Sequence, residues 1–137
     1  MTNELPEGLI ETTGPDTTVP EAVERLTAVI EANEKLRLIA TVDHAAGAAS
    51  VGLELEPTVE LFFGNPALGT PLMHLARTVA IDLPQKILIT QDGDGVRVLH
   101  NDPAYLASRH GIAVDTPQLQ VVSGALQNLA NAAAGAT

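Results

Sequence analysis

The chain has 137 residues and a formal net charge of −10, with 45% hydrophobic residues but only 2% aromatic ones. Its few basic residues are scattered, so nothing resembles the basic stripe that neutralises nucleic-acid phosphates, and acidic membrane surfaces would repel the chain. The absence of cysteine excludes disulfides, thiolate nucleophiles and cysteine-ligated metals. The acidic opening segment lacks the apolar core of a secretory signal, and no apolar run is long enough to span a membrane. We therefore expect a cytoplasmic protein with an aliphatic core, folded as a single domain over residues 1–137.

The first third of the chain predicts a strand, a helix and a second strand. LIETTG (9–14) is typical of a short strand, and Thr18 with Glu21 matches the pattern of a capping box. Apolar residues at helical spacing then predict a helix over 19–33. In KLRLIATVDH (35–44) apolar and polar residues alternate, and alternation along a strand places one set of side chains on the same face: Leu36, Leu38, Ala40, Val42 and His44.

The middle of the chain predicts further strands and a helix. AAGAAS (45–50) is interpreted as a short helical turn or a loop. VGLELE (51–56) and TVELFFG (58–64) both indicate strands, the first because its apolar residues alternate with glutamates. Thr70 followed by Pro71 predicts the start of a helix, with the threonine as its cap and the proline in the first turn.

The last third predicts a hairpin and two helices. QKILIT and VRVLH flank the turn sequence DGDG (92–95), whose residues tolerate positive φ angles. Asp102 precedes a proline and predicts a short helix, Thr116 predicts a long last helix in the same way, and residues 131–137 are expected to form a flexible tail. The fold class is therefore α+β, with one mixed or antiparallel sheet of four to five strands and helices mainly on one face.

His44 is the first candidate for a functional residue. Its predicted strand parity points it toward the apolar face, where a charge is costly. It is then either a neutral core histidine or an imidazole at a cavity mouth that binds a ligand or acts as a general base. Asp43 points to the opposite face, so the adjacent pair is not expected to work as a base with its orienting carboxylate. His110 is interpreted as a helix-end charge.

Phosphate and metal sites have little support in the sequence. GNPALGT (64–70) lacks the lysine of a phosphate-binding loop and is better explained as a strand-to-helix turn, whose first-turn amides could hold a small anion. DGDG is not followed by the later carboxylate ligands of a calcium loop. No histidine pair has the spacing of a metal-binding helix, so we expect no metal and no cofactor, and the weak candidates for metal ligands are His44, His74 and His100.

Three blocks, VDHAAGAASVGLELEPTVELFFGNPALGTPLM, IDLPQKILI and HNDPAYLASRHGI, follow one another in an order that resembles the domain of unknown function 302 family. The resemblance covers residues 8–130 and implies a small bacterial or archaeal α+β domain that forms dimers, with no settled activity. It carries the family's recurrent polar positions onto Asp43, His44, Asn65, Asp82, Asn101 and Asp102. Glu60, His74 and His100 stand where an aliphatic residue, a glutamine-like residue and a tyrosine are usual.

Three functional hypotheses follow. The first is a non-catalytic homodimer that binds a small molecule or an anion in a pocket formed by His44, Asn65, Asn101 and Asp102. The second is an enzyme in which His44 is the general base and Asp102 or Asp82 orients it. The third is a self-assembly module whose last helix makes the contacts through Leu126 and Leu129.

Overall fold

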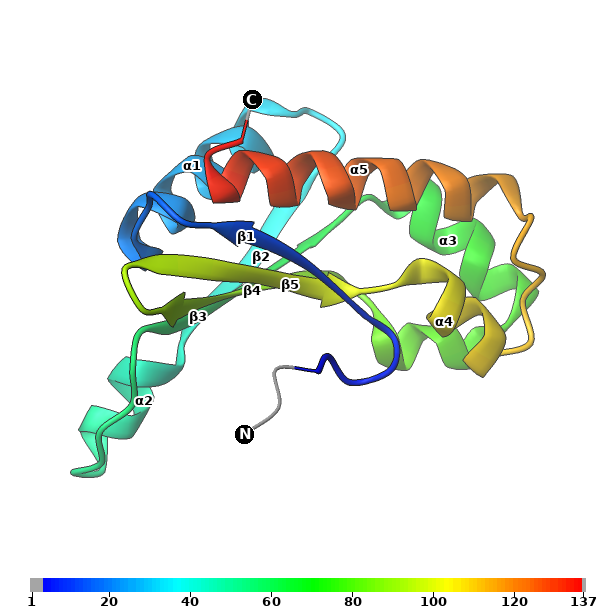
Figure 1. Ribbon diagram of the computed structural model, residues 1–137. Helices are drawn as coiled ribbons and strands as arrows, with labels where there is room; N and C mark the ends of the chain where they lie inside the picture. Colours follow the sequence, from blue (N-terminus) through cyan, green and yellow to red (C-terminus); the bar gives the residue numbers. More distant parts are fainter. Residues whose placement is uncertain (1–3, 137) are drawn as a thin grey trace.

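In the computed structural model, which describes residues 4–136, one five-stranded sheet is covered on one face by helices (Figure 1). The strands have the order β1-β5-β4-β3-β2, and each neighbouring pair is antiparallel. Their bounds are β1 Leu9–Gly14, β2 Arg37–Asp43, β3 Thr58–Gly64, β4 Gln85–Asp92 and β5 Gly95–Asn101. The predicted α+β class is confirmed, with the sheet antiparallel throughout rather than mixed.

Five α-helices and one 3-10 helix connect and follow these strands. Their bounds are α1 Val19–Ala32, α2 His44–Ser50, α3 Pro66–Leu75, η1 Arg77–Asp82, α4 Pro103–Arg109 and α5 Pro117–Ala134. Helices α1 and α5 lie side by side over the sheet, α3 and α4 lie near one end of it, and α2 projects from the other end (Figure 1). Within residues 4–136 no helix combines the length and the hydropathy needed to cross a bilayer.

The main core lies between the sheet and the α1–α5 layer. Leu26 and Ile30 of α1 and Leu61, Ile87 and Ile89 of the central strands are completely buried there. A smaller cluster fills the space between α3, η1, α4 and the start of α5, and it consists of Leu72, Val79, Ala107, Ile112 and Leu119. Both clusters are mostly aliphatic, as the composition requires, and the main cluster also contains Phe63.

The last helix cannot make self-assembly contacts in the way we predicted. Leu126 and Leu129 have exposed fractions of 1% and 5%, because they face the sheet and form part of the main core. The helix also extends further than expected, through Ala134, so residues 131–134 are helical rather than part of a flexible tail. Arg25 of α1 donates hydrogen bonds of 3.1 and 2.7 Å to the carbonyl oxygens of Ala132 and Ala133 and so holds this end. Thr137, the last residue of the predicted tail, lies outside the described residues.

Two other predicted elements differ in the structure. Residues 51–56 form no strand: they are exposed and pair with no other strand, so their alternation does not reflect a half-buried sheet position. Helix α3 begins at Pro66 and not at Pro71, because the side-chain oxygen of Asn65 accepts the amide hydrogen of Ala67 and caps the helix five residues before the predicted cap, Thr70. Pro71 therefore lies inside the helix.

A bulge in β2 reverses the predicted orientation of His44. The pairing of β2 with β3 shifts register between Leu38 and Ala40, so Leu38 lies beside the buried Phe63 while Ala40 lies beside Phe62 on the uncovered face. An extra residue in one strand changes which face every later side chain takes. His44 consequently lies on the uncovered side, and with 44% of its side chain exposed it is not a core histidine.

Candidate functional site

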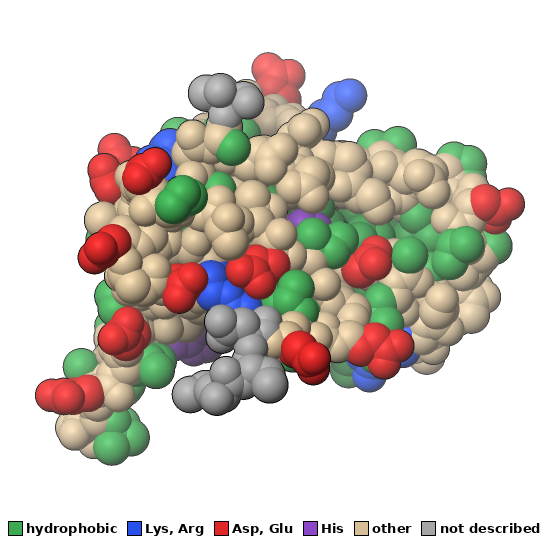
Figure 2. Space-filling model, in the orientation of Figure 1, with side chains coloured by type: hydrophobic (Ala, Val, Ile, Leu, Met, Phe, Trp, Pro, Cys, Tyr) green, Lys and Arg blue, Asp and Glu red, His purple; other side chains and the backbone are tan. Residues whose placement is uncertain are grey.

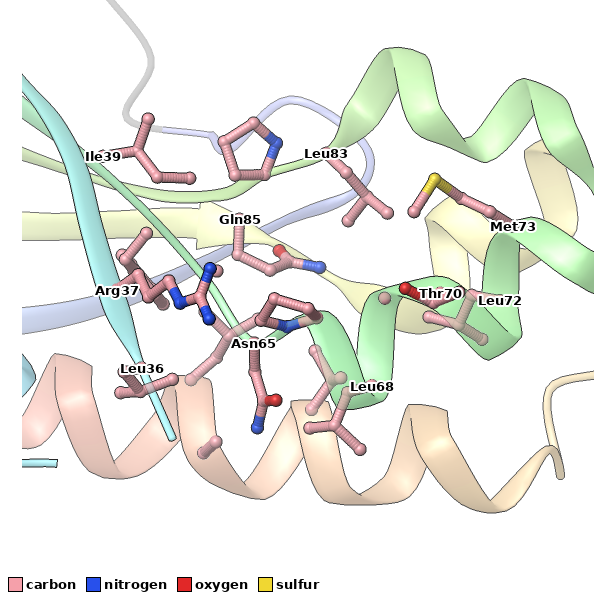
Figure 3. A pocket seen from close by; sticks show the side chains of 18 of the residues that line it. Leu36, Arg37, Ile39, Asn65, Leu68, Thr70, Leu72, Met73, Leu83 and Gln85 are labelled. Carbon is pink, nitrogen blue, oxygen red and sulfur yellow. The ribbon is translucent and has the colours of Figure 1, made fainter. Parts of the chain in front are cut away.

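A cavity lies beside the beginning of β2, between α3 and α5 (Figure 3). Its volume is about 480 Å³, which lies within the range of small-molecule sites. Leucine side chains from four different segments make up much of its wall, and these are Leu36, Leu68, Leu72, Leu83, Leu126 and Leu129. Because the wall comes from α3, α5, η1 and the ends of three strands, the fold assembles this pocket from residues far apart in the sequence.

Four polar side chains stand among the apolar ones at this pocket: Arg37, Asn65, Thr70 and Gln85 (Figure 3). Within residues 4–136 no carboxylate lies within ion-pair distance of the Arg37 guanidinium. Asn65 uses its side-chain oxygen to cap α3, which leaves its amide nitrogen available to donate. An apolar cavity with a cation and two amides near its wall can bind a molecule that has an apolar body and an anionic group.

Only one of the four predicted ligand-binding residues lines this pocket. Asn65 lies at the pocket, whereas His44 lies beyond the opposite end of β2, a strand of seven residues or about 20 Å. Asn101 ends β5, where it pairs with Leu9 of β1, and Asp102 begins α4. The structure therefore does not bring His44 together with Asn65, Asn101 and Asp102.

Three of the family's polar positions cap helices. Asp43 accepts the amide hydrogen of Ala46 at 2.9 Å and caps α2, and Asp102 accepts that of Ala104 at 3.0 Å and caps α4. Asn65 plays the same part for α3. A side-chain oxygen at this position satisfies one of the amides that a helix start leaves unpaired. The local structure thus explains these residue types without a catalytic role for Asp102.

On the uncovered face of the sheet, two glutamates of the described residues contact basic side chains. His44 Nε2 lies 3.3 Å from Glu60 Oε1, so the histidine's partner is a residue that departs from the family pattern. Arg97 donates to both oxygens of Glu11, at 3.3 and 3.1 Å. The hydrogen bond that Arg97 donates to Glu11 raises the pKa of Arg97 above its ordinary value. Neither Asp82 nor Asp102 is a recorded partner of His44, so the predicted base with an orienting aspartate is not assembled there.

His110 is a candidate functional residue whose hydrogen-bond partners were not predicted from the sequence. Its side chain is only 6% exposed, its Nε2 forms a short hydrogen bond with Asp82, and its Nδ1 lies 2.9 Å from the hydroxyl of Thr78. Asp82 also accepts two hydrogen bonds from Arg109, at 3.0 and 3.1 Å. This network joins the end of α4 to η1 and does more than the helix-end charge we predicted. The sequence signal was weak, since Asp82 and His110 are 28 residues apart.

The weak metal candidates His44, His74 and His100 lie apart from one another. His44 is on the uncovered face of the sheet, His74 is exposed on α3, and His100 is buried on the helix-covered face with an exposed fraction of 3%. Nδ1 of His100 lies 2.9 Å from the carbonyl oxygen of Asn101, while its Nε2 has no hydrogen-bond partner among the described residues. Within residues 4–136 no three histidine or acidic side chains form a group that could hold a metal ion.

The family model for "Domain of unknown function DUF302" matches residues 10–134, nearly the whole chain. The chain belongs to the DUF302 family. A crystal structure of an uncharacterized conserved DUF302 protein from Bacillus stearothermophilus has the same fold, with a TM-score of 0.71. That alignment covers 95% of this chain and 98% of the other at 18% sequence identity, so it supports the fold alone.

Among curated proteins the chain is similar to part of longer proteins. It is 42% identical over 109 residues to "Fluoride-specific ion channel FluC 1" of Brucella suis biovar 1, an alignment of 77% of this chain and 42% of that protein. The protein of the same name from Brucella abortus biovar 1 gives the same identity, over 40% of its length. The DUF302 chain thus spans about two-fifths of these relatives.

Proposed function

We propose that this DUF302 protein binds a small molecule with an apolar body and an anionic group in the pocket between β2, α3 and α5. The observation that carries the proposal is the 480 Å³ apolar cavity beside Arg37, which has no ion-pair partner among residues 4–136. The proposal keeps the small-molecule or anion ligand expected from the sequence and moves its site away from His44. It also keeps the homodimer as a proposal.

The charges around the pocket favour a ligand that has an anionic group. Of the seven basic residues only Arg97 and Arg109 form ion pairs with a carboxylate among residues 4–136, and Arg37 is the basic residue in the lining of the pocket. A guanidinium binds carboxylate, sulfonate or phosphate groups through charge-assisted hydrogen bonds, which are stronger than neutral ones. Asn65 and Gln85 supply neutral donors on the same side of the cavity (Figure 3).

A fluorescence titration with 1-anilinonaphthalene-8-sulfonate tests the proposal, because this probe joins an apolar ring system to a sulfonate. We expect saturable binding to the folded chain, weakened about tenfold or more by Arg37→Glu, since a charge-assisted hydrogen bond contributes about 1.5–3 kcal/mol. Lys35→Glu is the matched control: it makes the same change in charge two residues away, outside the pocket wall. Decanoate should displace the probe if a carboxylate can take the sulfonate's place.

Two outcomes would contradict the proposal. Absence of saturable probe binding at millimolar concentrations would show that the cavity does not accept such a molecule. Equal loss of affinity in Arg37→Glu and Lys35→Glu would show that the probe responds to overall charge and not to a contact with Arg37.

A second candidate function comes from the Brucella proteins named as fluoride-specific ion channels. A segment 42% identical to this chain occurs within them, which supports a role for the DUF302 chain alongside fluoride transport. Growth of a strain lacking this gene at increasing fluoride concentration tests that role. Hypersensitivity that the wild-type gene reverses would support it, and an unchanged fluoride tolerance would contradict it. Testing Arg37→Glu in the same strain would show whether the pocket takes part.

A further inference from the structure

Residues 44–57, called the arm here, project from the end of the sheet and contain helix α2 and the segment that returns to β3 (Figure 1). No residue of α2 is buried. Beyond α2, Val51, Leu53 and Leu55 have exposed fractions of 71%, 65% and 50%. Exposed apolar side chains grouped on one projecting segment are typical of an interaction surface.

The arm also carries charge in a regular pattern. Glu54 and Glu56 alternate with Leu53 and Leu55 along the returning segment. Figure 2 shows acidic and hydrophobic side chains together on this projection. A surface that fits the arm must therefore offer both an apolar hollow and a cation beside it.

The pocket offers both features on the same molecule. Its wall is largely aliphatic, and Arg37 at its edge has no ion-pair partner among the described residues. The arm of the same chain cannot reach it, however. The arm leaves β2 after Asp43, whereas the pocket lies at Arg37, the other end of that strand, about 20 Å away. An arm that fills this surface must come from another chain.

We propose that the arm of a second copy of this chain packs over the pocket. Leu53 and Leu55 contact the apolar wall and Ile39, whose exposed fraction is 60%, and Glu54 or Glu56 pairs with Arg37. Because the same two surfaces exist on both copies, the exchange is reciprocal and gives a closed two-fold dimer. The inference rests on the pocket of the proposed function and adds that the arm of a second chain uses the same apolar wall and the same Arg37 as the ligand, so that the arm and the ligand compete for the site.

Strand β2 allows the two copies to approach each other along the edge of the sheet. It is the outermost strand on its side, so one row of its backbone groups has no partner strand. Its register shift at Leu38 and Ala40 disrupts that row, and bulges of this kind oppose continuous pairing with another edge strand. The side chains of the arm, rather than a continuous backbone ladder, therefore make the contact.

Disulfide trapping tests the proposal directly, because the chain has no cysteine of its own. Leu53→Cys in one copy and Ile39→Cys in an affinity-tagged second copy place one thiol on the arm and one at the pocket. Both positions are exposed, so each variant should keep the unfolding temperature of the wild type. On mild oxidation of the mixture we expect a mixed disulfide whose mass is one tagged plus one untagged chain.

The matched control replaces Ile39→Cys by Asp94→Cys, an exposed position in the β4–β5 turn. It should give several-fold less mixed disulfide than the Ile39→Cys pair. Equal yields from the two mixtures, or no mixed disulfide from either, would overturn the proposal, since the arm would then have no preference for the pocket.

Charge reversal gives a second, independent readout by native mass spectrometry. Arg37→Glu alone and the pair Glu54→Arg with Glu56→Arg should each raise the dimer dissociation constant about tenfold or more, and combining all three changes should restore it. Failure of the combined variant to recover would contradict the pairing with Arg37.

The failure of this inference can be told from the failure of the proposed function. Saturable binding of 1-anilinonaphthalene-8-sulfonate by a chain that stays monomeric and forms no selective disulfide would support the proposed ligand and contradict the contact between the arm and the pocket. Selective disulfide trapping without probe binding would support the dimer and contradict the small-molecule ligand.

Discussion

Strands β2 and β3 lead at one end into the helix-covered body of the protein and at the other end into the arm. At the body end Leu68 and Leu72 of α3 both line the pocket, and Leu68 packs against the main core while Leu72 belongs to the smaller cluster. At the arm end Leu53 and Leu55 remain exposed. Burying such a side chain contributes about 1.5–3 kcal/mol. The body obtains this stabilisation within its own chain, whereas the arm can obtain it only from a contact outside the chain.

The largest expected effect is a difference between the body and the arm in how much a leucine contributes to the free energy of unfolding. Leu61→Ala removes a completely buried side chain between the sheet and α1, and we expect it to lower the free energy of unfolding by about 2–5 kcal/mol. Leu53→Ala, the matched change in the arm, should lower it by less than about 0.5 kcal/mol at low protein concentration, because the side chain makes no core contact. Urea unfolding of both variants at one fixed concentration measures the difference.

A large loss of stability from Leu53→Ala that does not depend on protein concentration would contradict the view that the arm makes no stabilising contact within its own chain. A loss that grows with protein concentration would instead support a contact between copies, because such a contact stabilises the folded chain by mass action.

The next effect concerns the network that joins η1 to α4 inside the body. Asp82→Asn keeps the size of the side chain but removes the charge that accepts from Arg109 and from the buried His110, and we expect a loss of about 1–3 kcal/mol. Arg109→Gln should cost less than about 1 kcal/mol, since 55% of the Arg109 side chain is exposed to solvent. Thermal unfolding of the two variants tests the order, and a larger loss from Arg109→Gln would contradict it.

Helix caps give a smaller contrast between body and arm. The hydroxyl of Thr18 accepts the amide hydrogen of Glu21 at 3.3 Å and caps α1, so Thr18→Ala should lower global stability by about 1 kcal/mol. Asp43→Ala removes the equivalent bond of α2 and should leave global stability unchanged, because α2 buries nothing. Its effect should appear in hydrogen exchange as faster exchange of the Ala46 amide. Equal losses of global stability would show that α2 folds as part of the body.

Most of the fold could be predicted because its signals are local. The capping box at Thr18, the turn residues between β4 and β5 and the spacing of apolar residues in α5 each depend on neighbours within a few positions. The failures arose where a contact far along the chain decided the outcome. Residues 51–56 alternate like a strand but have no partner strand, and the bulge in β2 depends on its pairing with β3.

The candidate site was less predictable than the fold, for the same physical reason. Asn65 was predicted because the family resemblance marks it and because it lies in the strand-to-helix turn GNPALGT, although the helix was expected to begin later, at Pro71. Arg37 was missed because nothing around it in the sequence shows that α3 and α5 would form an apolar wall beside it. Polar residues shared by the family drew attention to Asp43 and Asp102, whose side chains cap helices. A residue type that suits catalysis suits capping equally well.

The smallest effect should be a gain, in the body, from replacing His100. This imidazole is 3% exposed and its Nε2 has no hydrogen-bond partner among the described residues, so it adds a desolvation cost that no contact offsets. His100→Leu removes that nitrogen at similar volume and should raise the free energy of unfolding by up to about 1 kcal/mol, even though the bond to the Asn101 carbonyl is lost. His74→Leu, an exposed histidine on α3, serves as the control and should change stability by less than about 0.5 kcal/mol. A fall of more than about 1 kcal/mol in the free energy of unfolding of His100→Leu would show that Nε2 has a stabilising partner. The buried histidine would then stabilise the body through a hydrogen bond in the core, a contribution that the exposed residues of the arm do not make.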